Sequence, residues 1–235
     1  MANTSFQFKQ FVVEQAHCAM KVNTDGVLLG AWAKAGEAER ILDIGTGTGV
    51  IALMMAQQCP TAMIDAIDID ARAAGQAKTN VEHSAWNERL CVYHSALQDF
   101  KPAYSYDFIV SNPPYFVNDL KPTDTRKSVA KHSVDLSYDE LLTNVHRLLS
   151  ETGQFAVVIP YFNKALFLEK AAGFGLFVSS ALRVQAREDK VPYLALLQLE
   201  RRKGEELEEE LVIQTLSGEY TAEYKALTQA FYLKF

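Results

Sequence analysis

The tetrapeptide Asn112-Pro113-Pro114-Tyr115 combines residue types that suit chemistry on a planar amino group. Its two prolines stiffen the backbone, so the side-chain carbonyl of Asn112 and the backbone carbonyl of Pro113 are expected to converge as two acceptors. An exocyclic amino group offers two N–H donors to such a pair, and both bonds together free its nitrogen lone pair for attack. Tyr115 adds a flat face on which a base can stack, worth roughly 1–3 kcal/mol. The tetrapeptide therefore predicts catalysis on an exocyclic nitrogen by positioning and electrostatics, without a strong base.

A glycine-rich segment, Asp43-Ile44-Gly45-Thr46-Gly47-Thr48-Gly49, stands between a predicted strand and a predicted helix. Its spacing is G-x-G-x-G, and Val50 stands where a dinucleotide fingerprint needs its last glycine. A pyrophosphate is held by bare helix amides, whereas the carboxylate of Asp43 suits the cationic amino acid end of S-adenosylmethionine (SAM). Asp68 ends the next predicted strand, where an acid can accept hydrogen bonds from both ribose hydroxyls. The two features together predict a SAM site, and a plain tight turn is the alternative.

No acid directly follows the third predicted strand, although in many such sites an acid at this place binds the adenine amino group of the cofactor. It is followed by His94-Ser95-Ala96-Leu97, with Asp99 further on. Backbone groups of Ala96 and Leu97 are therefore expected to read the adenine instead.

Strand-like and helical runs alternate between residues 40 and 200. Buried strands are predicted over 40–44, 62–67, 90–93, 108–110 and 155–159, and helices over 50–58, 71–84, 137–149 and 164–172. Asp70 and the Ser137–Glu140 capping box mark helix starts, and Gly153 marks a helix exit. Two further runs, 176–184 and 193–199, predict an antiparallel hairpin at one edge. We therefore expect an α/β fold with a Rossmann-like, mostly parallel sheet of seven strands, which binds its ligand beyond the strands' carboxyl ends.

The formal net charge of −6 argues mildly against a nucleic-acid partner, but its distribution does not. Residues 200–210 hold three basic and six acidic side chains, and this acidic run is predicted to be a solvated loop or helix face. Directly after the tetrapeptide, residues 119–131 hold four basic side chains against two acidic ones. These basic residues, Lys121, Arg126, Lys127 and Lys131, are expected to contact RNA phosphates beside the base pocket, with a solvated loop as the alternative.

The three cysteines, Cys18, Cys59 and Cys91, form no C-x-x-C pair and predict neither a disulfide framework nor a metal site. The N-terminal residues have no apolar stretch that suits a signal peptide, and no apolar run is long enough for a membrane span. We therefore expect a cytoplasmic protein without a metal and without membrane contact.

The motifs resemble those of class I SAM-dependent methyltransferases that act on an exocyclic or amide nitrogen. The runs Phe6–Phe11 and Met20–Trp32 resemble the N-terminal signature of the bacterial tRNA-Val adenosine-37 N6-methyltransferase family, and Tyr224–Leu233 resembles that family's ending. The resemblance covers nearly the whole chain. It implies N6-methylation of adenosine 37 in the anticodon loop of tRNA-Val, with SAM as the methyl donor. Asn23 departs from the family pattern, in which glycine is more common.

The resemblance also implies roles for individual residues. SAM would be bound by Thr24, Asp43, Gly45, Thr46, Gly47, Gly49, Asp68 and Asn112, and the target adenine would be held by Asn112, Pro113, Pro114 and Tyr115. Residues 1–235 would form a single methyltransferase domain. In it, an N-terminal extension (1–39) would pack over the cofactor site, residues 40–200 would form the SAM-binding sheet, and residues 201–235 would form a C-terminal extension.

Several other functions share some of these features. The tetrapeptide also occurs in guanine-N2 methyltransferases of rRNA and in protein-glutamine N5-methyltransferases. The former are usually larger, with a duplicated domain, and the latter carry a helical substrate domain ahead of the SAM domain, for which about forty residues leave too little room. Val50 and the tetrapeptide disfavour an NAD oxidoreductase. The intact acceptors at Asn112 and Pro113 disfavour a SAM- or RNA-binding module without turnover.

Overall fold

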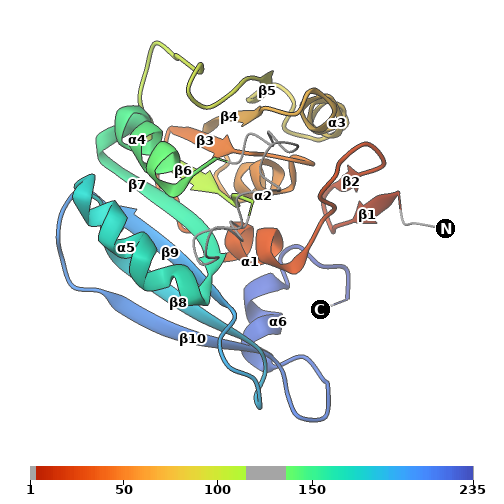
Figure 1. Ribbon diagram of the computed structural model, residues 1–235. Coiled ribbons are helices and arrows are strands. Elements are labelled where there is room, and N and C mark those ends of the chain that lie inside the picture. The colour runs from red at the N-terminus through yellow and green to blue at the C-terminus, as the bar shows by residue number, and fades with distance from the viewer. Residues whose placement is uncertain (1–3, 115–135, 235) are drawn as a thin grey trace, which may run out of the picture.

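The computed structural model describes residues 4–114 and 136–234, and Figure 1 shows a twisted sheet between two layers of helices. The strands are β1 (Ser5–Gln7), β2 (Val12–Glu14), β3 (Arg40–Ile44), β4 (Met63–Asp68), β5 (Leu90–His94), β6 (Tyr106–Ser111), β7 (Leu149–Pro160), β8 (Phe177–Arg187), β9 (Leu194–Glu200) and β10 (Leu207–Gln214). The helices are α1 (Thr24–Trp32), α2 (Val50–Gln58), α3 (Ala71–Glu82), α4 (Tyr138–Leu148), α5 (Lys164–Gly173) and α6 (Ala222–Thr228), with a 3-10 turn η1 (Tyr161–Asn163).

The main sheet has the strand order β10-β8-β9-β7-β6-β3-β4-β5 within the described residues. Strands β5, β4, β3, β6 and β7 are mutually parallel, and β9 runs antiparallel to both β7 and β8. The predicted α/β sheet, mostly parallel with an antiparallel edge hairpin, is confirmed. The predicted number of strands is wrong, because β10 joins the described sheet as an eighth strand, parallel to β8.

Strand β10 contains much of the acidic run that we expected to be a loop or a helix face. Residues 207–210 are exposed, whereas Leu211 and Ile213 are buried in the core. Two of the acids meet cations of neighbouring elements: Glu210 lies 2.6 Å from Arg183, and Glu208 lies 2.9 Å from Lys164. Exposed ion pairs contribute little to stability. The strand is therefore held by its pairing with β8 and by the burial of its last apolar residues.

The two faces of the sheet bury different helices (Figure 1). Helices α1 and α2 lie in one apolar cluster, and every residue of α2 from Val50 to Ala56 is buried. Helix α4 lies in the cluster on the other face and starts with the predicted capping box, in which Ser137 and Glu140 bond reciprocally. It ends at Leu148 and β7 begins at the next residue, so the prediction that Gly153 marks a helix exit is wrong. A Cβ at Gly153 would lie 2.9 Å from the Tyr106 carbonyl oxygen, which explains the glycine inside a strand.

The N-terminal hairpin β1–β2 is fastened to distant parts of the chain. Phe8 pairs with Tyr232 near the C-terminus. The buried Asn80 side chain on α3 accepts from Glu14 N (2.9 Å) and donates to the carbonyl oxygens of Glu14 and Thr48 (both 2.8 Å). Asn80 thereby joins the hairpin to the glycine-rich segment and holds the chain that precedes α1 next to the carboxyl edge of the sheet.

Candidate active site

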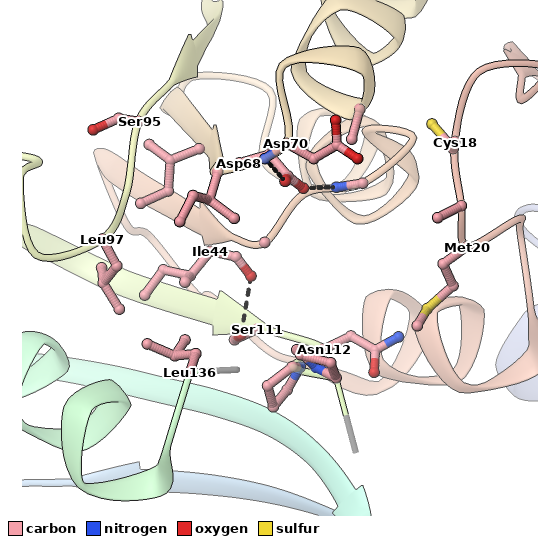
Figure 2. A pocket seen from close by; sticks show the side chains of 18 of the residues that line it. Cys18, Met20, Ile44, Asp68, Asp70, Ser95, Leu97, Ser111, Asn112 and Leu136 are labelled. Carbon is pink, nitrogen blue, oxygen red and sulfur yellow. Dashed lines mark hydrogen bonds between the residues drawn. The ribbon is translucent and has the colours of Figure 1, made fainter. Parts of the chain in front are cut away.

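An open cavity lies at the carboxyl edge of the sheet, beside the end of β3. Strand β3 has β4 on one side and β6 on the other, so the strand order reverses there and the sheet has its topological switch point. The cavity walls come from the loops after β3, β4, β5 and β6 and from the segment before α1 (Figure 2). These are the four strand ends at which the sequence placed its candidate residues.

The glycine-rich segment contributes two glycines to the cavity. Gly45 and Gly47 line it with positive φ angles of 70° and 57°, and a Cβ on either would meet no protein atom within 4 Å. Their bare backbone therefore faces the cavity. Gly49, with φ 82°, packs elsewhere: its Cβ would lie 3.3 Å from the Cβ of Ala77 on α3. Thr46 is buried and donates to Asp43 (2.6 Å), and neither Thr46 nor Gly49 lines the cavity.

Asp68, the last residue of β4, presents its carboxylate to the cavity (Figure 2). One oxygen accepts from Gly47 N and the other from Asp70 N, each at 2.8 Å. Burial raises the pKa of this carboxyl, and the two backbone hydrogen bonds offset part of that rise. Asp70 caps α3 by accepting from Arg72 N (2.8 Å), as predicted, and it also lines the cavity. Asp68 therefore links the loops after β3 and β4 and keeps further lone pairs for a ligand.

Asp43 lies behind the glycine-rich segment rather than in the cavity wall. Its side chain is completely buried, and one oxygen accepts from Thr46 Oγ1 (2.6 Å) and from Ala52 N at the start of α2 (3.2 Å). The other oxygen has no hydrogen-bond partner among the described residues. Burial, the largest effect, raises the pKa of Asp43 to about 7, against the two hydrogen bonds. Asp43 therefore braces the turn into α2.

The raised pKa of Asp43 makes stability depend on pH. The folded chain binds this proton more tightly than the unfolded chain, so the free energy of unfolding should fall as the pH rises from about 4 to about 7. Asp43→Asn keeps one oxygen for Thr46 and Ala52 and removes the charge. We compare the free energy of unfolding of the variant with that of the parent at each pH. This difference should be more favourable to the variant at pH 8 than at pH 5, by on the order of a few kcal/mol. Urea unfolding at both pH values measures this difference, and the exposed Asp99→Asn serves as control; equal pH dependence of Asp43→Asn and parent would contradict it.

Asn112, Pro113 and Pro114 line the cavity directly after β6. The strand end is tied to the glycine-rich segment, because Ser111 Oγ donates to the carbonyl oxygen of Ile44 (2.9 Å; Figure 2). The Asn112 side chain has no hydrogen bond to another residue in the described ranges. Its Nδ2 lies 3.5 Å from where a Cβ on Gly26 would stand, so α1 borders it. The amide is therefore positioned by its surroundings and available to a ligand.

The loop after β5 contributes one residue that the sequence analysis named, Leu97, and two that it missed, Ser95 and Gln98. All three line the cavity, whereas Ala96 does not. Ser95 and Leu97 lie on the side opposite the N-terminal segment (Figure 2). Gln98 is held at 3.5 Å from Glu140, through its amide nitrogen. The signal that could have identified them is their polar character, since Ser95 and Gln98 follow β5 where we looked for an acid to bind the adenine.

The segment before α1 forms the remaining wall. Cys18, Ala19 and Met20 line the cavity, with Cys18 and Met20 facing Ser95 and Leu97 across it (Figure 2). Burial and two nearby carboxylates raise the pKa of the Cys18 thiol to about 11, so it stays protonated. Asn23 caps α1 by accepting from Gly26 N (2.9 Å). Thr24 begins α1 and does not line the cavity.

Five candidate residues, Tyr115, Lys121, Arg126, Lys127 and Lys131, lie outside the described residues. In the part of the chain that the structure describes, no group of His, Cys, Asp and Glu side chains is arranged to hold a metal ion. The same residues include no helix that is both long and apolar enough to cross a bilayer.

The fold and the cavity define a class of protein. The family model "Methyltransferase small domain" matches residues 16–173, more than half of the chain. A predicted O-methyltransferase from Agrobacterium tumefaciens shares the fold with a TM-score of 0.68 at 14% identity, over 88% of this chain and 96% of that one. The ribosomal protein L11 methylase from Lactobacillus delbrueckii subsp. bulgaricus has a TM-score of 0.59 at 17% identity, over 81% and 84%. The chain is thus a member of the methyltransferases.

Relatives of the same length narrow the class. The chain is 43% identical over 237 residues to the tRNA1(Val) (adenine(37)-N6)-methyltransferase of Dyadobacter fermentans, covering 99% of both chains. It is 45% identical over 240 residues to the enzyme of that name from Bacteroides fragilis strain YCH46, covering all of both chains. The chain belongs to the tRNA1(Val) (adenine(37)-N6)-methyltransferase family, which confirms the resemblance seen in the sequence.

Proposed function

We propose that this protein transfers a methyl group from SAM to N6 of adenosine 37 in the anticodon loop of tRNA-Val, in the cytoplasm. The observation that carries the proposal is the position of Asn112 and Pro113 in the wall of a cavity that also contains Gly45, Gly47 and Asp68. Full-length similarity to proteins named for this reaction supports the choice of substrate.

The residues of the cavity fit SAM. Gly45 and Gly47 offer bare backbone to the cofactor, and the Asp68 carboxylate lies where ribose hydroxyls can donate to it. Ile67 and Leu97 supply apolar walls for a flat adenine ring, and the side chains of Ser95 and Gln98 supply polar atoms for its edge. When bound, SAM supplies an electrophilic methyl group. Asp43 supports this site from behind, by bracing the turn into α2.

The residues after β6 activate the acceptor nitrogen. The Asn112 side-chain oxygen and the Pro113 carbonyl accept the two N–H donors of the adenine amino group, which directs the nitrogen lone pair toward the methyl donor. Pro114 stiffens the turn that holds both acceptors, and Tyr115 stacks on the base. Because the two prolines restrict the backbone that carries both acceptors, catalysis rests on orientation and electrostatic complementarity.

The proposal includes one methyltransferase domain over residues 1–235. The N-terminal extension (1–39) packs over the cofactor, which is supported by Cys18, Ala19 and Met20 in the cavity wall. The C-terminal extension (201–235) supplies β10 and α6 to the far edge of the sheet and contacts the N-terminal hairpin through Tyr232.

The basic segment that follows the tetrapeptide is proposed to hold the RNA backbone. Changing Arg126, Lys127 and Lys131 together to glutamine should weaken tRNA binding and reduce the slope of log affinity against log salt by about 2, since each lost phosphate contact lowers it by ~0.7. Filter binding at several salt concentrations measures the slope. The matched control changes Arg202 and Lys203 to glutamine, two exposed cations between β9 and β10. An unchanged slope in the triple variant would place the phosphate contacts elsewhere.

The target position is tested with two tRNA-Val transcripts that differ only at nucleotide 37. An adenosine in the loop is already unpaired, so its presentation to the cavity costs less than flipping a paired base. We expect methyl transfer to the transcript with adenosine 37 and none when guanosine replaces it. Transfer to rRNA or to a protein glutamine, with none to tRNA, would favour one of the two alternative acceptors. SAM binding without transfer to any of them would favour a binding module.

A further inference from the structure

Phe162 is an exposed aromatic residue at the carboxyl edge of the sheet. Its side chain is 72% exposed and lies in the 3-10 turn η1, directly after β7. The turn is held on both sides, because Tyr161 N donates to the Tyr193 carbonyl oxygen (2.9 Å) and the buried Asn163 donates to Tyr138 Oη (3.2 Å). The ring is therefore presented to solvent by a fixed piece of backbone.

The turn between β8 and β9 carries two more apolar side chains at the same edge. Pro160 of β7 pairs with Leu194 of β9, so η1 lies beside the residues that precede β9. Among these, Val191 is 80% exposed and Tyr193 is 37% exposed. We call Phe162, Val191 and Tyr193 the apolar platform.

The platform adjoins the place proposed for the target base. Ser111 of β6, the residue before Asn112, pairs with Val157 of β7, and the two strands run parallel, so η1, which follows β7, lies at the same edge of the sheet as Asn112. On the other side, burial and, after it, the nearby carboxylate of Asp25 on α1 raise the pKa of the Tyr193 hydroxyl. Gly26, the next residue, borders Asn112. A nucleotide next to one held at Asn112 would therefore reach the platform.

The cations near the platform, Arg187, Lys190 and Lys164, lie beside acidic partners. Arg187 is paired with Asp189 (2.5 Å), which also lies 3.8 Å from Lys190. Lys164, two residues after Phe162, lies 2.9 Å from Glu208 and 3.4 Å from Glu206. An apolar surface with an outward aromatic ring, whose neighbouring cations are already paired, suits the flat face of an unpaired base rather than a phosphate.

We propose that the apolar platform stacks one base of the anticodon loop that is the immediate neighbour of the target adenosine. This inference rests on the proposed function and adds a second base contact to it. The platform is a positioning element: it orients the loop so that the target base reaches Asn112, and it takes no part in methyl transfer. Its contribution to RNA binding is independent of salt, unlike that of the basic segment.

The test compares Phe162→Ala with Phe162→Trp on an anticodon stem-loop. Loss of one stacked base should raise the KM for RNA by about 5- to 100-fold in the alanine variant, with kcat, the SAM dissociation constant and the salt slope unchanged. Tryptophan should restore the KM to within about threefold. Met63→Ala is the matched control, because Met63 is 47% exposed at the first residue of β4, at the opposite edge of the sheet, and should leave the KM unchanged.

Two further stem-loops, each lacking the base on one side of the target adenosine, show which of the two neighbouring bases stacks on the platform. For one of the two abasic loops, Phe162→Ala should cause no further rise in KM, because the stacked base is already gone. An unchanged KM in Phe162→Ala, or the same rise on the intact and both abasic loops, would overturn the platform. A dimer that this substitution dissociates would likewise overturn it, in favour of contact between copies. Failure of the unmodified enzyme to methylate the intact loop would instead refute the proposed function.

Discussion

Replacing Asn112 with alanine should lower the rate of methyl transfer by on the order of 10²–10³-fold or more, while SAM binding stays nearly unchanged. The side chain lines the cavity at the end of β6 and has no hydrogen bond to another described residue, so its loss should not loosen the fold. In the proposed mechanism, the variant loses one of the two acceptors that activate the amino nitrogen. Single-turnover rates at saturating SAM and tRNA measure this step.

The matched control for this variant is Asn87→Ala, which removes an exposed asparagine from the loop before β5, at the opposite edge of the sheet. It should turn over like the parent. A single-turnover rate for Asn112→Ala within threefold of the parent would refute the acceptor mechanism. A large loss of SAM binding would show that Asn112 serves mainly the cofactor.

Replacing Asp68 with alanine should raise the SAM dissociation constant by about 10- to 100-fold, since a hydrogen bond to a charged group contributes ~1.5–3 kcal/mol. We expect two effects to add: the proposed acceptor of the ribose hydroxyls is lost, and Gly47 N and Asp70 N lose the carboxylate that joins their loops. The rate at saturating SAM should fall much less, because Asp68 lies at the end of β4 and not beside Asn112 in the sheet. Calorimetric titration with SAM provides the measurement.

Two further variants separate these effects. Asp68→Asn keeps an acceptor for one backbone amide and should bind SAM with intermediate affinity. Asp99→Asn changes an exposed acid after β5 and should bind SAM like the parent. An unaltered SAM dissociation constant in Asp68→Ala would contradict a hydrogen bond from the ribose hydroxyls to Asp68. Asp68 would then serve only to join the loops after β3 and β4.

Features with local causes could be predicted from the sequence. The Asp70 cap and the Ser137–Glu140 capping box depend on residues within one helical turn, and both are present. The glycine-rich segment and the residues Asn112, Pro113 and Pro114 follow strands that the alternation of apolar runs predicts, and the order of these strands brings both to one edge of the sheet.

Features with distant causes could not be predicted in this way. Strand β10 depends on its pairing with β8. Its acidic side chains indicated a solvated segment, although two of its apolar residues, Leu211 and Ile213, are buried. Cys18 and Met20 reach the cavity because Asn80 on α3 fastens the hairpin before them. Asp43 was expected to face the cationic end of SAM, but its side chain is buried behind the glycine-rich segment. This burial depends on how the turn packs against α2, which the spacing of residues in the sequence does not reveal.

The most direct test of the central claim is nucleoside analysis of a methylation reaction. Bulk tRNA from a strain that lacks this gene is incubated with the protein and labelled SAM, then digested to nucleosides and separated. The proposal predicts that the label appears as N6-methyladenosine and that tRNA-Val carries it at position 37. Label in N2-methylguanosine, or in protein with none in tRNA, would contradict it.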